Sequence, residues 1–168
     1  IEALSHKNGH YLVFFPSFRY MDMVHRIVES RTTPSNARII VQTPEMSEKE
    51  KTAFMGHFER FEDRPLIAFA IMGGHFGEGI DLIGDRLNGV IIVGAGLPQI
   101  SPERQILLQY FQEKFSDGFA FAYRFPGWEK VLQASGRVIR DENDLLTHSE
   151  YIKANVERWR GDKYFIEE

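Results

Sequence analysis

The sequence contains no cysteine, and this absence excludes several kinds of site. None of its 168 residues can form a disulfide, a thiolate zinc site, an iron–sulfur cluster or a cysteine nucleophile. The six histidines stand in no metal-ligand spacing with a carboxylate partner, so we expect no metal site. A reducing environment fits this composition best, and we expect a cytoplasmic protein.

Long apolar runs are also missing. The longest, residues 66–72 and 90–93, are far shorter than the roughly 20 residues that a membrane-spanning helix needs, so we expect no membrane partner. Residues 1–9 hold no apolar core behind a basic start, and the first residue is not Met. These features predict a domain excised from a longer protein, without a targeting signal.

A basic excess, the usual mark of nucleic-acid binding, is absent as well. The chain has 20 basic and 24 acidic side chains, which gives a formal net charge of −4. Composition alone therefore argues mildly against DNA. Any such role depends on a few well-placed donors, for example helix N-terminal amides that hold phosphates.

Apolar strand patterns alternate with helical patterns along the chain. Strands are expected at residues 9–16, 37–42, 66–72 and 89–93, and helices at residues 17–33, 48–61, 101–115 and 128–140. This alternation predicts one α/β domain with a parallel sheet between helices and with ligands at the carboxyl ends of the strands. Residues 66–72 are apolar without alternation, which is typical of a central strand covered on both faces.

An aromatic segment separates the last two helices. Phe119, Phe121, Tyr123 and Phe125 alternate as in a strand and could stack on bases. Aromatic residues at this density are more often part of a core, and we favour that interpretation.

A glycine-rich loop follows the expected central strand. Residues 73–82 contain four glycines and two carboxylates, Glu78 and Asp81, so backbone amides there could approach a ligand. The alternative is a turn that only needs positive φ angles. The loop lacks the Lys-Ser/Thr ending of a phosphate-binding P-loop. Residues 94–96 lack the third glycine of a dinucleotide fingerprint, and we interpret them as a structural turn.

Residues 133–140 place Gln133, Arg137 and Arg140 on one helical stripe. Two fixed guanidinium groups suit a phosphate. A solvated basic face, or pairing with Asp141 and Glu142, explains the spacing about equally well.

Three segments together resemble a known family. Residues 11–20, 78–82 and 133–140 are similar to motifs IV, V and VI of the DinG/XPD branch of superfamily two DNA helicases. The connecting residues 84–87 and 93–100 are similar as well. The resemblance implies that residues 1–168 form the second RecA-like motor domain, a three-layer domain of the P-loop NTPase type with a mainly parallel sheet between helices.

The resemblance also implies a role for each site residue. Such helicases hold ATP and Mg²⁺ mainly on a first RecA-like domain, which this sequence does not include, and they move along single-stranded or forked DNA. The partners would be that N-terminal domain and the DNA, and the isolated chain would be inactive. The roles would be Arg137 and Arg140 as arginine fingers with Gln133 as polar partner, Glu78, Gly79 and Asp81 as contacts that couple nucleotide to DNA, and Ser17, Arg19 and Thr43 on the DNA track.

Two other functions remain open, and one segment departs from the family pattern. A non-catalytic nucleotide-sensing or protein-interaction domain could share the fold, whereas a small-molecule enzyme is disfavoured because no nucleophile–base pair appears. The family continues after motif VI through one more strand, but here Asp144 is followed at once by Leu145. Either residues are missing at this junction or the sheet closes differently, with residues 163–166 as a candidate edge strand.

Overall fold

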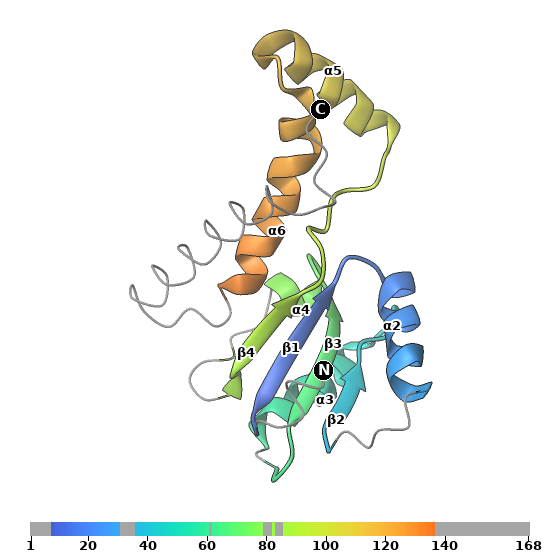
Figure 1. Cartoon of the computed structure of the whole chain (residues 1–168), viewed down its shortest axis with the longest axis vertical. Helices are drawn as coiled ribbons and strands as arrows, with labels where there is room; N and C mark the ends of the chain where they lie inside the picture. The colour runs from blue at the N-terminus through green and yellow to red at the C-terminus, as the bar shows by residue number, and fades with distance from the viewer. Residues whose placement is uncertain (1–7, 31–35, 61, 79–81, 83–85, 137–168) are drawn as a thin grey trace, which may run out of the picture. The chain divides into compact units, whose positions relative to one another are not determined.

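The structure, a computed structural model, describes residues 8–30, 36–60, 62–78, 82 and 86–136 (Figure 1). The chain divides into two compact units, residues 1–138 and 139–168, and all described residues belong to the first. The junction between Asp144 and Leu145 and the candidate edge strand at residues 163–166 therefore lie outside the described residues.

Four strands form one parallel sheet. They are β1 (His10–Phe15), β2 (Arg38–Val41), β3 (Leu66–Ile71) and β4 (Gly89–Ile92), in the order β2-β3-β1-β4. The prediction of a parallel sheet is confirmed, and β3 is an interior strand as its unbroken apolar run indicates. Because all strands are parallel, their carboxyl ends meet at one edge, which we call the carboxyl edge.

Helices cover both faces of the sheet. On one face, Met21 of α2 (Phe18–Ser30) packs with Val13, Phe15 and Phe69. The other face is covered by α3 (Glu48–Gly56), α4 (His75–Glu78) and α6 (Phe125–Ser135). From these helices, Phe54, Phe76 and Ala134 pack against the strand side chains that point to this face. Both faces of the inner strands β1 and β3 are therefore buried, and the fold is the three-layer α/β domain that the sequence predicts.

The helix expected at residues 48–61 is shorter than its pattern suggests. The capping box at Ser47 and Glu50 is present at its start, but α3 ends at Gly56 and continues as a 3-10 turn, η1 (His57–Glu59). Phe58 in this turn is fully buried, with its ring centroid 6.4 Å from that of Phe54. The change from α-helix to the tighter 3-10 turn places the Phe58 side chain in the core, and the burial of this ring stabilises the turn.

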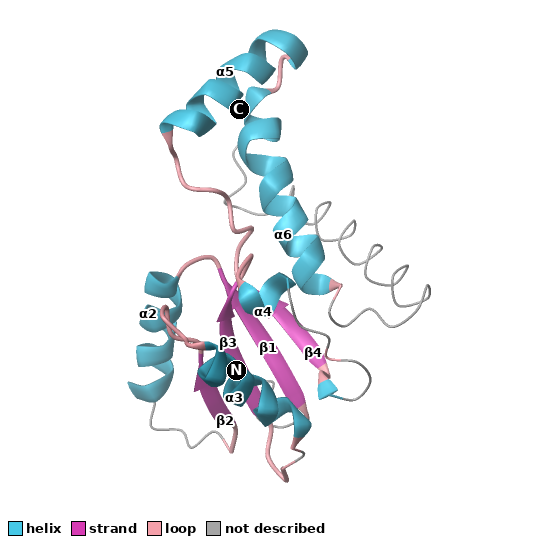
Figure 2. Cartoon of the chain, turned by 180° about the vertical axis from the view of Figure 1, so that it is seen from behind, coloured by secondary structure: helices cyan, strands magenta, loops and turns pink. Residues whose placement is uncertain are grey.

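The aromatic segment is helical, so the strand-like interpretation of its alternation is wrong. Helix α5 (Pro102–Phe115) and α6 are joined by a π-helix, η3 (Ala120–Arg124), and this arm extends beyond the carboxyl edge (Figure 2). Asp117 Oδ1 accepts the Ala120 N–H at 3.1 Å, so the turn starts a helix at once. As a result, α6 begins at Phe125 and not at residue 128.

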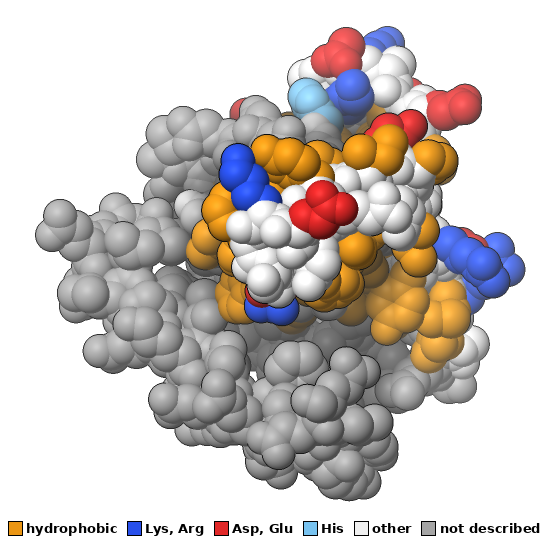
Figure 3. Space-filling view, turned by 90° about the horizontal axis from the view of Figure 1, so that it is seen from above, with side chains coloured by type: hydrophobic (Ala, Val, Ile, Leu, Met, Phe, Trp, Pro, Cys, Tyr) orange, Lys and Arg blue, Asp and Glu red, His pale blue; other side chains and the backbone are white. Residues whose placement is uncertain are grey.

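The aromatic side chains of the arm are only partly in a core. Tyr123 is buried, whereas Phe119 and Phe125 are about half exposed, at 48% and 51%. The rings of Phe111 and Phe121 stack with centroids 4.6 Å apart. In the view from above, exposed hydrophobic side chains cover much of the described surface, and the charged side chains stand apart from one another (Figure 3). The prediction that these aromatics form a core is therefore correct for Tyr123 and wrong for Phe119 and Phe125.

Candidate functional site

The carboxyl edge brings several predicted site residues together. Ser17 follows β1, Thr43 follows β2, and α4 with Glu78 follows β3. Because β3 lies between β1 and β2, and neighbouring strands are about 4.8 Å apart, the exits of β1 and β2 lie roughly 10 Å from each other. Ser17 and Thr43 thus stand on either side of the glycine-rich exit of β3.

Ser17 caps the helix that leaves this edge. Its Oγ accepts the Tyr20 N–H at 3.3 Å, and its carbonyl accepts the Met21 N–H at 3.0 Å. Free amides at a helix start attract anions. The first turns of α2 line a surface hollow formed by Ser17, Arg19, Tyr20, Asp22, Met23 and Arg26.

The two arginines of this hollow differ in their partners. Arg26 pairs with Asp22 at 2.9 Å. Arg19 is exposed, and no carboxylate pairs with it within the part of the chain that the structure describes. Its guanidinium is therefore free to pair with a phosphate brought to the helix start.

Thr43 is exposed at the end of β2, and the residue before it fixes this exit in place. The Gln42 N–H donates to the Phe69 carbonyl at 2.9 Å, and Gln42 Oε1 accepts the Ile71 N–H at 2.8 Å. The Gln42 side chain thereby continues the hydrogen bonding between β2 and β3 beyond the last paired residue of β2. Sequence reasoning missed Gln42, whose only signal is a polar residue at the end of an apolar strand.

The glycine-rich loop turns sharply after β3. Gly73 has a φ of +71°, so the turn requires a glycine at this position. The Gly77 N–H then donates to the Gly74 carbonyl at 2.7 Å, and α4 ends at Glu78. Gly79 and Asp81 lie outside the described residues.

The turn after β4 also uses left-handed backbone. Gly94 and Gly96 have φ angles of +79° and +56°, which confirms residues 94–96 as a structural turn. These φ angles favour glycine because it has no Cβ.

Helix α6 carries the third predicted cluster towards this edge. Gln133 is exposed, and its neighbour Ala134 is buried in the core with Phe76. Arg137 and Arg140 lie outside the described residues. One turn before Gln133, Lys130 lies against the exits of β3 and β4, with Nζ 3.5 Å from the Gly96 carbonyl oxygen. Sequence reasoning missed Lys130, although its spacing of three residues from Gln133 was a usable signal.

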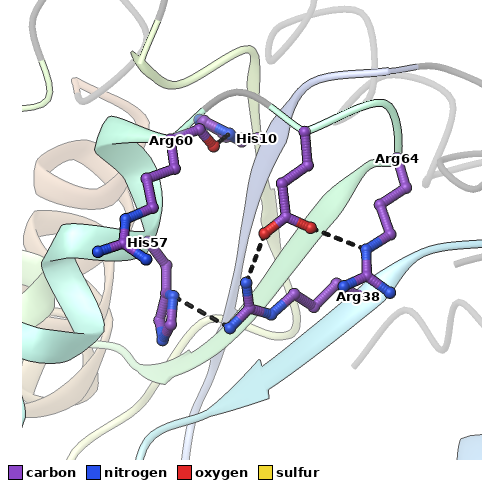
Figure 4. Close-up of polar contacts among 6 residues, drawn as sticks. His10, Arg38, His57, Arg60 and Arg64 are labelled. Carbon is purple, nitrogen blue, oxygen red and sulfur yellow. Dashed lines mark hydrogen bonds and ion pairs between the residues drawn. The ribbon is translucent and has the colours of Figure 1, made fainter.

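A second polar cluster lies at the opposite, amino edge of the sheet (Figure 4). Arg38, at the start of β2, donates to Glu62 Oε1 at 2.6 Å and lies 3.2 Å from His57 Nδ1, and Arg64 donates to Glu62 Oε2 at 2.8 Å. Hydrogen bonding from Arg64, together with Arg38, lowers the pKa of Glu62. Burial and the charges of Arg38 and Arg60 lower the pKa of His57. These contacts tie β2 to the loop after η1.

His10 is a core histidine at the same edge. It is 2% exposed, its N–H donates to Asn88 Oδ1 at 2.7 Å, and its ring nitrogens lie 2.9 Å and 3.2 Å from the carbonyl oxygens of Arg86 and Arg60. These contacts of His10 join the start of β1 to two other segments of the chain. Among the described residues, no group of three or more His, Asp or Glu side chains could hold a metal ion.

No helix in the described part of the chain is both long and apolar enough to cross a membrane.

Comparison with known proteins identifies the family. Residues 1–146 match the profile of a family described as helicase C-terminal domain. The chain belongs to this family. The resemblance of the motif segments to DinG/XPD-type helicases is thereby confirmed, and the sheet is that of a RecA-like helicase C-terminal domain.

Similar proteins are helicases by name. The domain is 30% identical over 159 residues to the ATP-dependent DNA helicase XPD of Sulfolobus acidocaldarius, covering 92% of this chain and 25% of that protein. It is 28% identical over 156 residues to the probable ATP-dependent helicase MJ0942 of Methanocaldococcus jannaschii, covering 86% of this chain and 23% of that protein. It is 28% identical over 152 residues to the ATP-dependent DNA helicase CHL1 of Debaryomyces hansenii, covering 79% of this chain and 18% of that protein. The chain thus spans a quarter or less of the length of these relatives.

Proposed function

We propose that this helicase C-terminal domain is the second motor domain of an ATP-dependent DNA helicase of the DinG/XPD type. It would work beside an N-terminal RecA-like domain that holds most of the ATP and Mg²⁺, and it would couple hydrolysis to the unwinding of DNA. The match of the family over residues 1–146 carries this proposal. The grouping of strand exits at one edge supports it, because ligands of parallel α/β sheets bind there.

In this proposal, Ser17, Arg19 and Thr43 lie on the track of single-stranded DNA. Two observations support the assignment: Ser17 and Arg19 line one hollow at the start of α2, and Thr43 is exposed at the same edge. A hydroxyl, a guanidinium and free helix amides are donors that suit the phosphates of a strand. Forked DNA would present such a strand beside its duplex.

We assign the nucleotide contacts from the family motifs. Arg137 and Arg140 are the arginine fingers, and Gln133 is their polar partner on the same helical stripe. A planar guanidinium stabilises the charge that spreads over the oxygens of the transferred phosphoryl group, an effect of about 10³–10⁵ in rate.

The glycine-rich loop supplies the coupling in this proposal. Glu78, Gly79 and Asp81 contact the nucleotide side of the edge and transmit its state to the DNA. The position of Glu78 at the end of α4, directly after β3, supports this assignment.

The test uses a polypeptide that carries this domain together with a first motor domain. Arg137→Ala or Arg140→Ala should lower the kcat of DNA-stimulated ATP hydrolysis about 10³-fold or more, with little change in nucleotide affinity, because a finger acts as charge develops. Arg60→Ala is the matched control, since Arg60 is exposed at the amino edge. Normal turnover in a finger variant would remove that residue from the role. ATP binding without any hydrolysis by the wild type would instead favour a nucleotide-sensing domain.

A further inference from the structure

Lys130 lies where α6 crosses the exits of β3 and β4. Its side chain is partly buried, and Nζ donates a hydrogen bond to the Gly96 carbonyl at 3.5 Å. Gly96 belongs to the turn after β4, and Gly73 to the turn after β3. The lysine therefore stands at the carboxyl edge, where the proposed function places nucleotide and DNA.

The two glycines leave space for the lysine stem. A Cβ at Gly73 would lie 3.1 Å from Lys130 Cε and 3.2 Å from Cδ, closer than ordinary contact distances. A Cβ at Gly96 would lie 3.0 Å from Met72 Sδ and 3.8 Å from Lys130 Cδ. Both turns thus pack around the side chain, and its path across the edge is fixed by the backbone.

The ammonium group has unused donors. An ammonium can donate three hydrogen bonds, but the one that Lys130 makes to the described residues is long and goes to a neutral carbonyl. No ion pair joins Lys130 to a carboxylate within the described ranges. A partly buried cation that lacks an anion loses hydration without compensation, so a bound anion would stabilise it.

We propose that Lys130 binds a phosphate group at the carboxyl edge. This inference deepens the proposed function and rests on it. The phosphate belongs either to the backbone of single-stranded DNA or to the nucleotide, because both ligands share this chemistry. Lys130 precedes Gln133 by three residues on α6, so its ammonium group extends the predicted polar stripe by one turn.

The test titrates the 168-residue chain with two separate probes. One is a labelled oligothymidylate of about 12 nucleotides, within the site sizes of single-strand binding proteins. The other is inorganic tripolyphosphate, which carries the phosphates of a nucleotide without its base. Lys130→Met keeps the stem that packs against the glycines and removes only the charge. Lys130→Arg keeps the charge.

Two results would support the proposal, and they identify the source of the phosphate. For DNA, Lys130→Met should weaken oligothymidylate binding several-fold and reduce the slope of log affinity against log salt by about 0.7, the value for one phosphate contact on a single strand. For a nucleotide, the variant should weaken tripolyphosphate binding alone. Lys130→Arg should keep the wild-type salt slope in either case.

Lys114→Met is the matched control. Lys114 is an exposed lysine of the arm whose Nζ lies 5.4 Å from the ring centroid of Tyr110, and its loss should change neither titration. Wild-type binding of both probes by Lys130→Met overturns the inference and leaves the proposed function standing. Equal loss in Lys130→Met and Lys130→Arg, with a lowered melting temperature, shows a packing role and also overturns it. A wild-type chain that binds neither probe overturns the inference and the DNA track together.

Discussion

At the scale of single residues, His57 shows how its neighbours set a protonation state. Arg38 donates to His57 Nδ1, so the imidazole must be neutral at this nitrogen to accept the bond. Burial, followed by the charges of Arg38 and Arg60, lowers the pKa of His57 below its ordinary 6.5. The folded protein therefore takes up this proton at a lower pH than the unfolded chain.

The consequence is a loss of stability on acidification. The contribution of His57 to the free energy of unfolding should be complete above pH 6.5 and should fall as the pH drops from 6.5 through the lowered pKa of the folded state. Urea titrations of wild type and His57→Gln between about pH 8 and about pH 5 measure it as a difference that shrinks towards acid. Arg38→Met should weaken this dependence, because it removes one of the cations. A difference that grows towards acid would contradict the prediction.

Gly118 is a position where only glycine fits the backbone approach. A Cβ there would lie 2.1 Å from the backbone oxygen of Leu108 in α5 and 3.0 Å from Gln112 Cβ. Backbone cannot move aside as a flexible side chain can. The turn between α5 and η3 therefore needs glycine for space.

Gly118→Ala should destabilise the arm by about 3 kcal/mol, at the upper end of overpacking costs. Gly56→Ala is the matched control, because nothing lies within 4 Å of its Cβ position. This variant should be neutral or more stable by up to about 1 kcal/mol, since alanine favours helix over glycine. Chemical denaturation followed by circular dichroism measures both, and equal stability of the two variants would refute the close approach.

At the scale of elements, local signals decide where helices begin. Helix α3 starts at a complete capping box: Ser47 Oγ lies 3.4 Å from the Glu50 nitrogen, and the Ser47 N–H donates to Glu50 Oε2 at 2.7 Å. At the start of α5, the N-cap Ser101 accepts the Arg104 N–H with its side chain, and Pro102 stands at the first helical position. The hydrogen bonds from Ser47 lower the pKa of Glu50.

Ser47→Ala should reduce stability by about 1 kcal/mol, the usual effect of losing an N-cap side chain. The pKa of Glu50 should also rise towards its ordinary value, because the side-chain hydrogen bond from Ser47 is the largest cause of its lowering. Carboxyl titration by NMR and thermal unfolding measure the two effects. Ser135→Ala is the control: its hydroxyl donates to the Leu132 carbonyl within α6 and caps no helix start. If the pKa of Glu50 is the same in Ser47→Ala as in the wild type, the capping box between Ser47 and Glu50 is excluded.

At the scale of the whole molecule, the proposed function assigns to the chain only one side of a nucleotide site. No P-loop is present in the sequence, so the groups that cradle the β- and γ-phosphates and orient Mg²⁺ are absent from these 168 residues. Arginine fingers alone do not position a nucleotide.

The purified 168-residue chain should therefore hydrolyse ATP at a rate at least about 10³-fold below that of a polypeptide with both motor domains. Phosphate release with Mg²⁺ and single-stranded DNA measures this rate. Robust Mg²⁺-dependent turnover by the chain alone would contradict both this prediction and the assignment as a second motor domain.

The sequence by itself determined the alternation of strands and helices, the interior position of β3 and the starts of α3 and α5. Periodicity and capping depend on residues within one or two turns, so they can be read locally. The motif segments also indicated the family before any geometry was known. Of the candidate site, the family resemblance assigned Ser17, Arg19 and Thr43 to the DNA track. The structure places Ser17 and Thr43 after β1 and β2 at the carboxyl edge, and their role there stays a prediction.

Only the tertiary structure decided the strand order β2-β3-β1-β4, the π-helix η3 and the place of Lys130. Each depends on contacts between residues far apart in the chain, which no local pattern encodes. Phe119 to Phe125 alternate like a strand, but the small Ala120 and Ala122 let the segment pack as a helix beside α5. Likewise, Gly73 and Gly96 look like ordinary turn glycines in the sequence. Only the packing of α6 against the sheet edge brings the Lys130 side chain against both of them.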